Sequence, residues 1–151
     1  MYAAIRIRGS IKTSPDAKKT LSLLRLKAAN HFVLVKPEQK GMLEKVKGYI
    51  TFGEIDEETL GLAIQKRARL SGNKKLDKQF LKEKKLKDFK EMAKSILEGK
   101  TSLQSLGIKP VLRLGPPKKG YERAGIKKSY SVGGALGYRA SDINKLIKRM
   151  V

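Results

Sequence analysis

The stretch FVLVKPEQKGMLEKVKGYITFGEI, residues 32–55, indicates the fold most directly. Its first four residues form a short apolar run, which is typical of a buried strand. Pro37 and Glu38 follow, and a proline with an acidic neighbour is typical of the first turn of a helix. The apolar stripe of this helix is expected to be Met42, Leu43 and Val46. Residues 49–55 are then predicted to form the next strand.

The segment before this stretch predicts one more strand and one more helix. Residues 2–8 alternate in character, so we expect a strand whose outer face is basic and carries Tyr2, Ala4, Arg6 and Arg8. The sequence Ser-Pro-Asp at residues 14–16 offers a capping hydroxyl, a proline and an acid at a helix start. The apolar stripe of that helix is Ala17, Leu21, Leu24 and Ala28. The order strand, helix, strand, helix, strand within 55 residues predicts an α+β unit with helices on one face of a small sheet.

Helical and extended patterns continue beyond residue 55. Asp56 is expected to cap a third helix, whose buried side is Leu60, Ala63, Ile64 and Ala68. Residues 73–90 are rich in lysine and favour a solvated face, and residues 89–97 predict an amphipathic helix. Residues 110–114 are expected to form the last strand, at a sheet edge because it contains a proline. Apolar residues at helical spacing in 143–150 predict a C-terminal helix that docks on the core.

The charge is the most informative number in the composition. Lysine and arginine total 35 against 14 acidic residues, which gives a net charge of +21 over 151 residues. A folded chain with that charge repels itself unless a polyanion neutralises it, and RNA or DNA does so by releasing its counterions. There is no cysteine, no long apolar run and no signal-peptide pattern, so disulfides and membrane spans are excluded and a cytoplasmic protein is expected.

Residues 115–140 lack periodicity and are the candidate nucleic-acid site. The stretch is rich in glycine, proline and basic residues, and a loop of that length between two ordered elements is usually functional. Phosphates would be neutralised by Lys118, Lys119, Arg123, Lys127, Lys128 and Arg139. Ring faces for unstacked bases would come from Tyr121, Tyr130 and Tyr138. A flexible solvated linker is the alternative. We expect residues 115–140 to be protected from protease only when RNA is present, and equal protection in the free protein would mean that they pack as ordinary core.

The residues that usually carry catalysis or bind metals are missing or isolated. His31 is the one histidine, and without cysteine it cannot build a common zinc site. Residues 115–120 have the glycine spacing of a phosphate loop, but Tyr121 stands where that loop needs lysine. The acidic residues at 54–58 gather at a helix start, where the helix dipole accounts for them. No enzyme, cofactor or metal is therefore expected.

Several segments together resemble the large-subunit ribosomal protein L-thirty family, in its long archaeal-type form. The similar segments are residues 23–27 (LLRLK), 32–35 (FVLV), 48–53 (GYITFG), 132–134 (VGG), 137–139 (GYR) and 142–150 (DINKLIKRM). The resemblance implies a ferredoxin-like two-layer core over residues 1–55 with a small antiparallel sheet. It implies that residues 56–151 add a helical insertion, a basic RNA-binding loop and a C-terminal helix.

The resemblance also implies a function. It places the chain among rRNA segments and neighbouring ribosomal proteins of the large subunit in the cytoplasm, and it adds Arg25 and Lys27 to the RNA contacts. We add Arg113, which directly precedes the loop region. The expected role is a structural one, with RNA recognised by shape. Two alternatives stay open: an RNA-processing or modifying enzyme, which needs a catalytic constellation, and a DNA-compacting architectural protein, which would show no preference for rRNA over duplex DNA.

Overall fold

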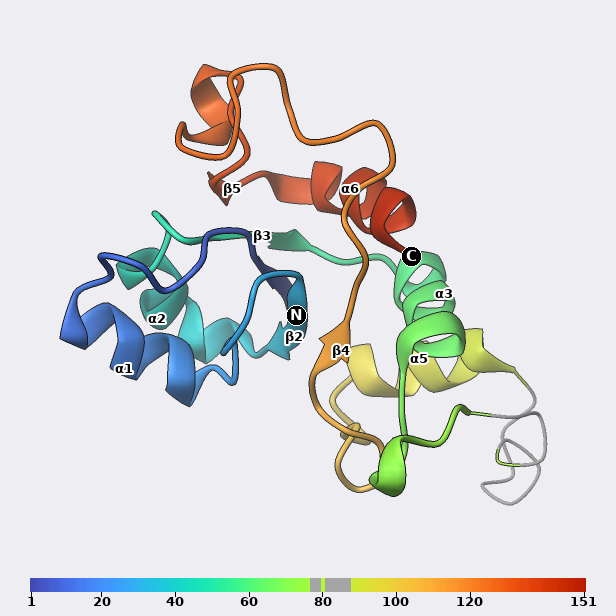
Figure 1. Ribbon diagram of the computed structural model, residues 1–151. Helices are drawn as coiled ribbons and strands as arrows, with labels where there is room; N and C mark the ends of the chain where they lie inside the picture. The colour runs from blue at the N-terminus through green and yellow to red at the C-terminus, as the bar shows by residue number, and fades with distance from the viewer. Residues whose placement is uncertain (77–79, 81–87) are drawn as a thin grey trace.

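The computed structural model describes residues 1–76, 80 and 88–151, and Figure 1 shows how its elements are arranged. Part of the lysine-rich segment 73–90, for which a solvated face is expected, lies outside the described residues. The strands are β1 (Tyr2–Arg6), β2 (His31–Val35), β3 (Ile50–Glu54), β4 (Leu112–Arg113) and β5 (Gly137–Tyr138). The α-helices are α1 (Pro15–Leu23), α2 (Lys40–Lys45), α3 (Glu57–Arg67), α5 (Phe89–Leu97) and α6 (Ile143–Met150). Short 3-10 turns are η1 (Pro37–Gln39), η2 (Ser71–Asn73), η3 (Tyr130–Val132) and η4 (Ala140–Asp142).

The five strands form one sheet in the order β4-β2-β1-β3-β5. The central strand β1 is antiparallel to β2 and β3, and β4 is antiparallel to β2. The outer strand β5 is parallel to β3. The antiparallel three-stranded core with α1 and α2 confirms the expected ferredoxin-like unit. Residues 110–114 do contribute an edge strand, but it is not the last one, because β5 follows it.

Helices cover both faces of the sheet (Figure 1). Helices α1 and α2 pack on one face, where the apolar cluster includes Leu21, Leu43, Val33 and Phe52. Helices α3, α5 and α6 pack on the other face, where the cluster includes Ile5, Phe32, Ile64, Met92 and Ile147. Alternating strand residues point to opposite faces, so each strand contributes to both clusters. None of the helices within the described ranges is both long and apolar enough to cross a bilayer.

The packing of α1 and α2 overturns the expectation of a basic outer face on β1, because these helices cover the face that carries Tyr2 and Ala4. Arg6 is only 3% exposed, and its guanidinium donates to the backbone oxygens of Leu26 and Lys27 at 2.7 and 2.8 Å. Burial lowers the pKa of Arg6. The period-two pattern correctly predicts a strand, but in a strand buried on both faces it does not predict which side meets water.

The end of α1 is a Schellman motif, which fixes the chain that leads into β2. Arg25 N–H donates to Ser22 O at 2.9 Å and Leu26 N–H donates to Leu21 O at 2.8 Å. Ser14 accepts from Ala17 N–H at 3.3 Å at the other end, as the predicted cap requires. The helix ends at Leu23, so Ala28 lies outside it and is exposed, and Leu26 fills the core in its place.

Candidate nucleic-acid interface

Segments from four parts of the chain meet at one end of the sheet. Because β1 is antiparallel to β2 and β3, its last residues lie beside the first residues of both, as in the pairs Ile5–Phe32 and Arg6–Ile50. The end of β4 joins them through the pair His31–Arg113. The beginning of β5 joins them through its parallel pairing with β3. We call residues 7–13, 24–30, 45–49 and 113–136 the basic end of the sheet.

Backbone hydrogen bonds hold these segments against one another. The N–H groups of Ile7 and Arg8 both donate to Tyr49 O, at 3.0 and 3.1 Å. Asn30 N–H donates to Arg6 O at 2.7 Å, and Leu114 N–H donates to Asn30 O at 3.0 Å. Loops far apart in sequence are therefore held in fixed positions at the basic end by backbone hydrogen bonds.

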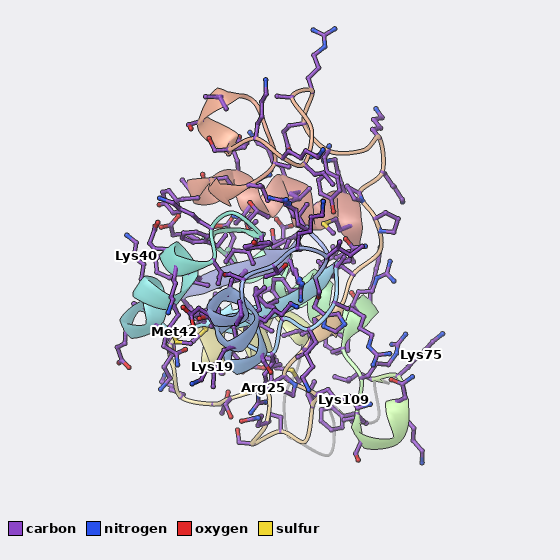
Figure 2. The ribbon with its side chains drawn as sticks, turned by 60° about the vertical axis from the view of Figure 1, so that its left-hand side comes forward. Lys19, Arg25, Lys40, Met42, Lys75 and Lys109 are labelled. Atoms are coloured by element: carbon purple, nitrogen blue, oxygen red, sulfur yellow. The ribbon has the colours of Figure 1, made fainter. Side chains whose placement is uncertain are left out.

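The charge of this surface is nearly all of one sign. Glu122 is the single carboxylate in its sequence. Its cations are Arg8, Lys12, Arg25, Lys27, Lys45, Lys47, Arg113, Lys118, Lys119, Arg123, Lys127 and Lys128, of which only Arg8 is partly covered. Eight of the nine cations named from the sequence thus belong to these segments, and the buried Arg139 does not. The side chain of Arg25 lies against Gln104, on the side where Figure 2 shows Lys109. The remaining four, Arg8, Lys12, Lys45 and Lys47, are not part of that prediction, because only the strand register places their short turns here.

Residues 115–136, which we call the strap, run across this end from β4 to β5 (Figure 1). Their first part is fixed to the end of α6, where Gly115 and Lys118 donate to the oxygens of Met150 and Arg149 at 3.0 and 2.9 Å. The last carbonyls of a helix have no partner within it, so the strap satisfies two of them. Tyr121 donates from its hydroxyl to Asn30 Oδ1 at 3.1 Å and packs against Ile7.

The second part of the strap folds on itself. Ala124 N–H donates to Gly133 O and Ala135 N–H donates to Gly125 O, both at 3.1 Å. A side chain at Gly134 would overlap the backbone of Lys128, so this close approach requires glycine. Ala135 and Leu136 are buried against Ile7. The region is therefore not the structureless loop that its lack of periodicity suggests.

We expect the strap to resist proteolysis in the free protein, because its hydrogen bonds are intramolecular. This replaces the expectation that protection requires RNA. Limited digestion with trypsin, whose cleavage positions are identified by mass spectrometry, checks it. Cuts after Lys127 and Lys128 should appear no faster than cuts in α6. Rapid cleavage there without RNA would contradict the packed arrangement.

Arg139 is buried and holds the strap. Its side chain is 1% exposed and lies 2.7 Å from Glu122 Oε1. It also donates to Thr51 Oγ1 at 2.7 Å and to Ala135 O at 2.8 Å. These contacts leave no face of the guanidinium open to a phosphate, so this residue does not lie with the exposed cations.

Two arginines, Arg139 and Arg149, act on the pKa of the Glu122 carboxyl group. Burial alone would raise the pKa of Glu122, but the hydrogen bond from Arg139 and the charges of Arg139 and Arg149 outweigh it and lower that pKa. Arg149 lies 3.2 Å from Glu122 Oε1. Because Glu122 is paired twice, it does not cancel the charge of the exposed cations.

The three tyrosines occupy different environments. Tyr121 is half-buried, and burial raises its pKa. Tyr130 donates to Asp142 Oδ2 at 2.7 Å, and one face of its ring is covered by Arg139, 4.5 Å from the ring centre. Tyr138 is 47% exposed. Its hydroxyl donates to Glu54 at 2.7 Å, which raises the pKa of Tyr138 to about 12, and its ring packs on Phe52.

Arg25 has an unusual backbone. Its φ is +59°, at the helix-end position that glycine usually occupies. A non-glycine residue in this region costs about 1 kcal/mol, so the arginine side chain serves a purpose other than ending the helix. The guanidinium lies against the side-chain amide of Gln104, whose oxygen accepts from it. Figure 2 shows Arg25 in front of the chain that follows α5.

His31 is the first residue of β2 and is partly buried. Its Nδ1 accepts from Ala28 N–H at 3.4 Å. Partial burial, with the charges of Arg113 and Arg6, lowers the pKa of His31. Among the described residues, no three acidic, histidine or cysteine side chains gather into a metal site.

The sequence is similar to known proteins along its whole length. The family profile described as ribosomal protein L30p/L7e matches residues 2–50. Large ribosomal subunit protein uL30 of Nanoarchaeum equitans is 48% identical over 153 residues, which cover 100% of this chain and 99% of that protein. The uL30 proteins of Methanococcus vannielii and Methanosphaera stadtmanae are 48% and 43% identical, with at least 99% of each chain covered. Identity at this level over complete chains, together with the ferredoxin-like core, shows that the chain belongs to the family of large ribosomal subunit protein uL30.

Proposed function

We propose that this chain is a structural constituent of the large ribosomal subunit and that the basic end of the sheet binds rRNA. The observation that carries the proposal is the gathering of exposed cations from four segments whose single carboxylate, Glu122, is itself paired. The relatives are named as proteins of the large ribosomal subunit. No catalytic role is proposed, and the protein works on the ribosome in the cytoplasm beside neighbouring ribosomal proteins.

The dimensions of the surface suit an RNA backbone. Adjacent strands lie about 4.8 Å apart, so a surface across five strands is roughly 20 Å wide. Phosphates on both sides of a helical groove can then meet cations from different loops. Most of the cations belong to lysine, which contacts phosphate as a point charge, so shape rather than base sequence dominates recognition.

The anchored strap supports tight binding because its cations need little ordering. Lys119 occupies the third position of a turn closed by Gly120 N–H donating to Pro117 O at 2.9 Å, and its φ is +66°. Such a turn holds its side chain away from the core. Ordering a flexible loop on binding costs affinity, and a loop that is already fixed avoids that cost.

We propose a division of labour among the residues named from the sequence. Contacts with rRNA come from Arg25, Lys27, Arg113, Lys118, Lys119, Arg123, Lys127 and Lys128. The exposed ring of Tyr138 lies away from them, because its hydroxyl reaches Glu54 at the opposite end of β3. Tyr121, Tyr130 and Arg139 hold the strap instead. In the same view, residues 1–55 form the core unit, and residues 56–151 supply the second helical layer and the strap.

Replacing Lys118, Lys119 and Arg123 together with alanine should weaken binding to large-subunit rRNA and flatten its salt dependence. Each cation that no longer neutralises a phosphate lowers the slope of log K against log salt by about 0.7–0.9, so three substitutions correspond to roughly 2–3 units. Filter binding across a salt series measures this. An unchanged slope would place the RNA elsewhere on the protein.

A matched control removes the same charge from lysines that already have carboxylate partners. Lys100, Lys145 and Lys148 pair with Glu98, Asp142 and Glu58 at 2.7, 2.8 and 3.2 Å. Their combined replacement should change the slope little. Competition with duplex DNA at equal salt completes the test: structured rRNA fragments should win, whereas equal competition would favour a general DNA-compacting protein.

A further inference from the structure

A second basic feature lies at the start of β4, outside the basic end of the sheet. Residues 69–75 fold back on themselves around η2, with Leu70 N–H donating to Lys74 O at 2.9 Å. The turn is extended by bridges that pair Arg69 with Lys75 and Leu70 with Ile108. Lys109 N–H donates to Arg69 O at 2.9 Å. We call residues 69–75 with 108–109 the basic ribbon.

The ribbon carries positive charge that no carboxylate of residues 1–76 or 88–151 pairs with. Its basic residues are Arg69, Lys74, Lys75 and Lys109, and residues 68–76 and 106–113 contain no acidic residue. The three lysines are exposed. Within the described parts of the chain, none of the ion pairs involves them. Backbone hydrogen bonds hold these like charges together although they repel one another, which favours an anionic partner at this place.

The ribbon and the strap lie on different sides of the molecule. Lys109 precedes β4, whereas the strap follows it. In Figure 1 η2 lies at the bottom of the view and the folded part of the strap at the top. Figure 2, turned about the vertical axis, keeps Lys75 and Lys109 at the bottom. One short stretch of RNA backbone lying along the strap would therefore leave the ribbon uncovered.

The chemistry of the ribbon fits phosphates rather than bases. Its exposed charged side chains are lysines, which are flexible point charges, and residues 68–76 and 106–113 contain no aromatic residue on which a base could stack. An acidic protein segment would be drawn by the same charge. RNA is favoured because a regular row of phosphates supplies several anions to closely spaced lysines and releases counterions as it binds.

We propose that the basic ribbon is a second RNA-binding surface, which takes the phosphates of an rRNA segment distinct from the one held by the strap. The chain then bridges two RNA segments, with the sheet and helices α3 and α5 as a rigid spacer. This inference rests on the proposed function, because it assumes that the strap holds rRNA.

Hydroxyl-radical footprinting on cognate large-subunit rRNA tests whether the chain contacts two RNA segments, with each protein variant at saturating concentration. The ribbon variant replaces Lys74, Lys75 and Lys109 with alanine, and the strap variant replaces Lys118, Lys119 and Arg123. Wild type should protect two separate sets of nucleotides. The ribbon variant should lose one set and keep the other, and the strap variant should show the reverse. The charge-matched variant of Lys100, Lys145 and Lys148 should keep both sets.

The outcomes separate this inference from the function on which it rests. If wild type protects no nucleotides, the proposed function fails. If wild type protects rRNA and the ribbon variant gives the same footprint, or one weakened evenly at all positions, the second surface is wrong while rRNA binding stands. Thermal unfolding followed by circular dichroism, with a Tm within about 2 °C of wild type, corresponds to less than roughly 1 kcal/mol and identifies variants that keep the fold.

Discussion

Replacing Gly53 with alanine is expected to destabilise the protein by about 3 kcal/mol or more. Gly53 lies in β3 where η4 and the start of α6 cross the strand. A Cβ there would overlap the carbonyl oxygen of Ala140, and it would lie 3.0 Å from the carbonyl carbon of Ala140 and 3.2 Å from Ile143 Cβ. Two of these atoms belong to backbone, which cannot turn aside as a side chain can. The C-terminal segment would have to move away from the sheet.

Chemical denaturation measures the loss, and Gly48→Ala is the matched control. Gly48 is exposed, has no atom near the position of an added Cβ and has no positive φ. Its replacement should change the free energy of unfolding by less than about 1 kcal/mol. If the free energy of unfolding of Gly53→Ala also lay within about 1 kcal/mol of wild type, η4 could not pass as close to β3 as described.

Replacing Arg139 with alanine is expected to cost about 3–5 kcal/mol, the usual penalty for removing one partner of a buried ion pair. The change leaves Glu122 with Arg149 alone, at 3.2 Å. It also removes the donors that reach Thr51 and Ala135, which join β3 to the strap. Amide hydrogen exchange should therefore rise most in residues 124–136. Affinity for rRNA should fall as well, although Arg139 itself would touch no phosphate.

The double variant Arg139→Met with Glu122→Leu separates pairing from packing. Removing both charges leaves no fully buried unpaired ion, because Arg149, which also loses its partner, is 35% exposed. Buried pairs replaced by apolar groups often lose little stability. We expect the double variant to unfold with a higher free energy than Arg139→Ala. A cost below about 1 kcal/mol for Arg139→Ala alone would show that this arginine does not hold the strap.

Acid should destabilise the strap, and the lowered pKa of Glu122 explains why stability is lost at low rather than at high pH. Its pKa is lower in the folded chain than in the unfolded one, so its contribution to stability is present above the unfolded pKa. That contribution is lost as the pH falls through the lowered folded value, because the folded state must then take up a proton that opposes the pairing. The protection of residues 124–136 from hydrogen exchange, corrected for the intrinsic pH dependence of the exchange rate, should fall in wild type as the pH drops below the ordinary range of a glutamate, and less so in Glu122→Gln.

Local sequence signals predicted the first 55 residues well. The Ser-Pro-Asp start of α1 and the apolar run in β2 depend on residues only a few positions apart. Such short patterns determine the local backbone conformation directly. The C-terminal helix is a further case, since its apolar positions repeat at helical spacing and Ile143, Leu146 and Ile147 are all buried. The charge of the chain was likewise readable, because it depends on composition alone.

The roles of individual cations could not be predicted from the local sequence. Arg139 and Lys128 look alike in sequence, as basic residues in a glycine-rich stretch, yet one is buried and the other exposed. The difference arises from Thr51 and Glu122, which lie 88 and 17 positions away from Arg139. Arg6 is a similar case, because Leu26 and Lys27 become its acceptors only once β1 and the end of α1 are side by side.

The sequence by itself determined the order of the core elements, the excess of positive charge and the family resemblance, all of which rest on short-range patterns or on sums over residues. Only the tertiary structure decided that four separated segments share one end of the sheet, that the strap is anchored and that the ribbon lies apart from it. Strand register and the pairing of β5 with β3 set these positions. Such pairings are chosen by the packing of the whole chain, which no local window of sequence contains.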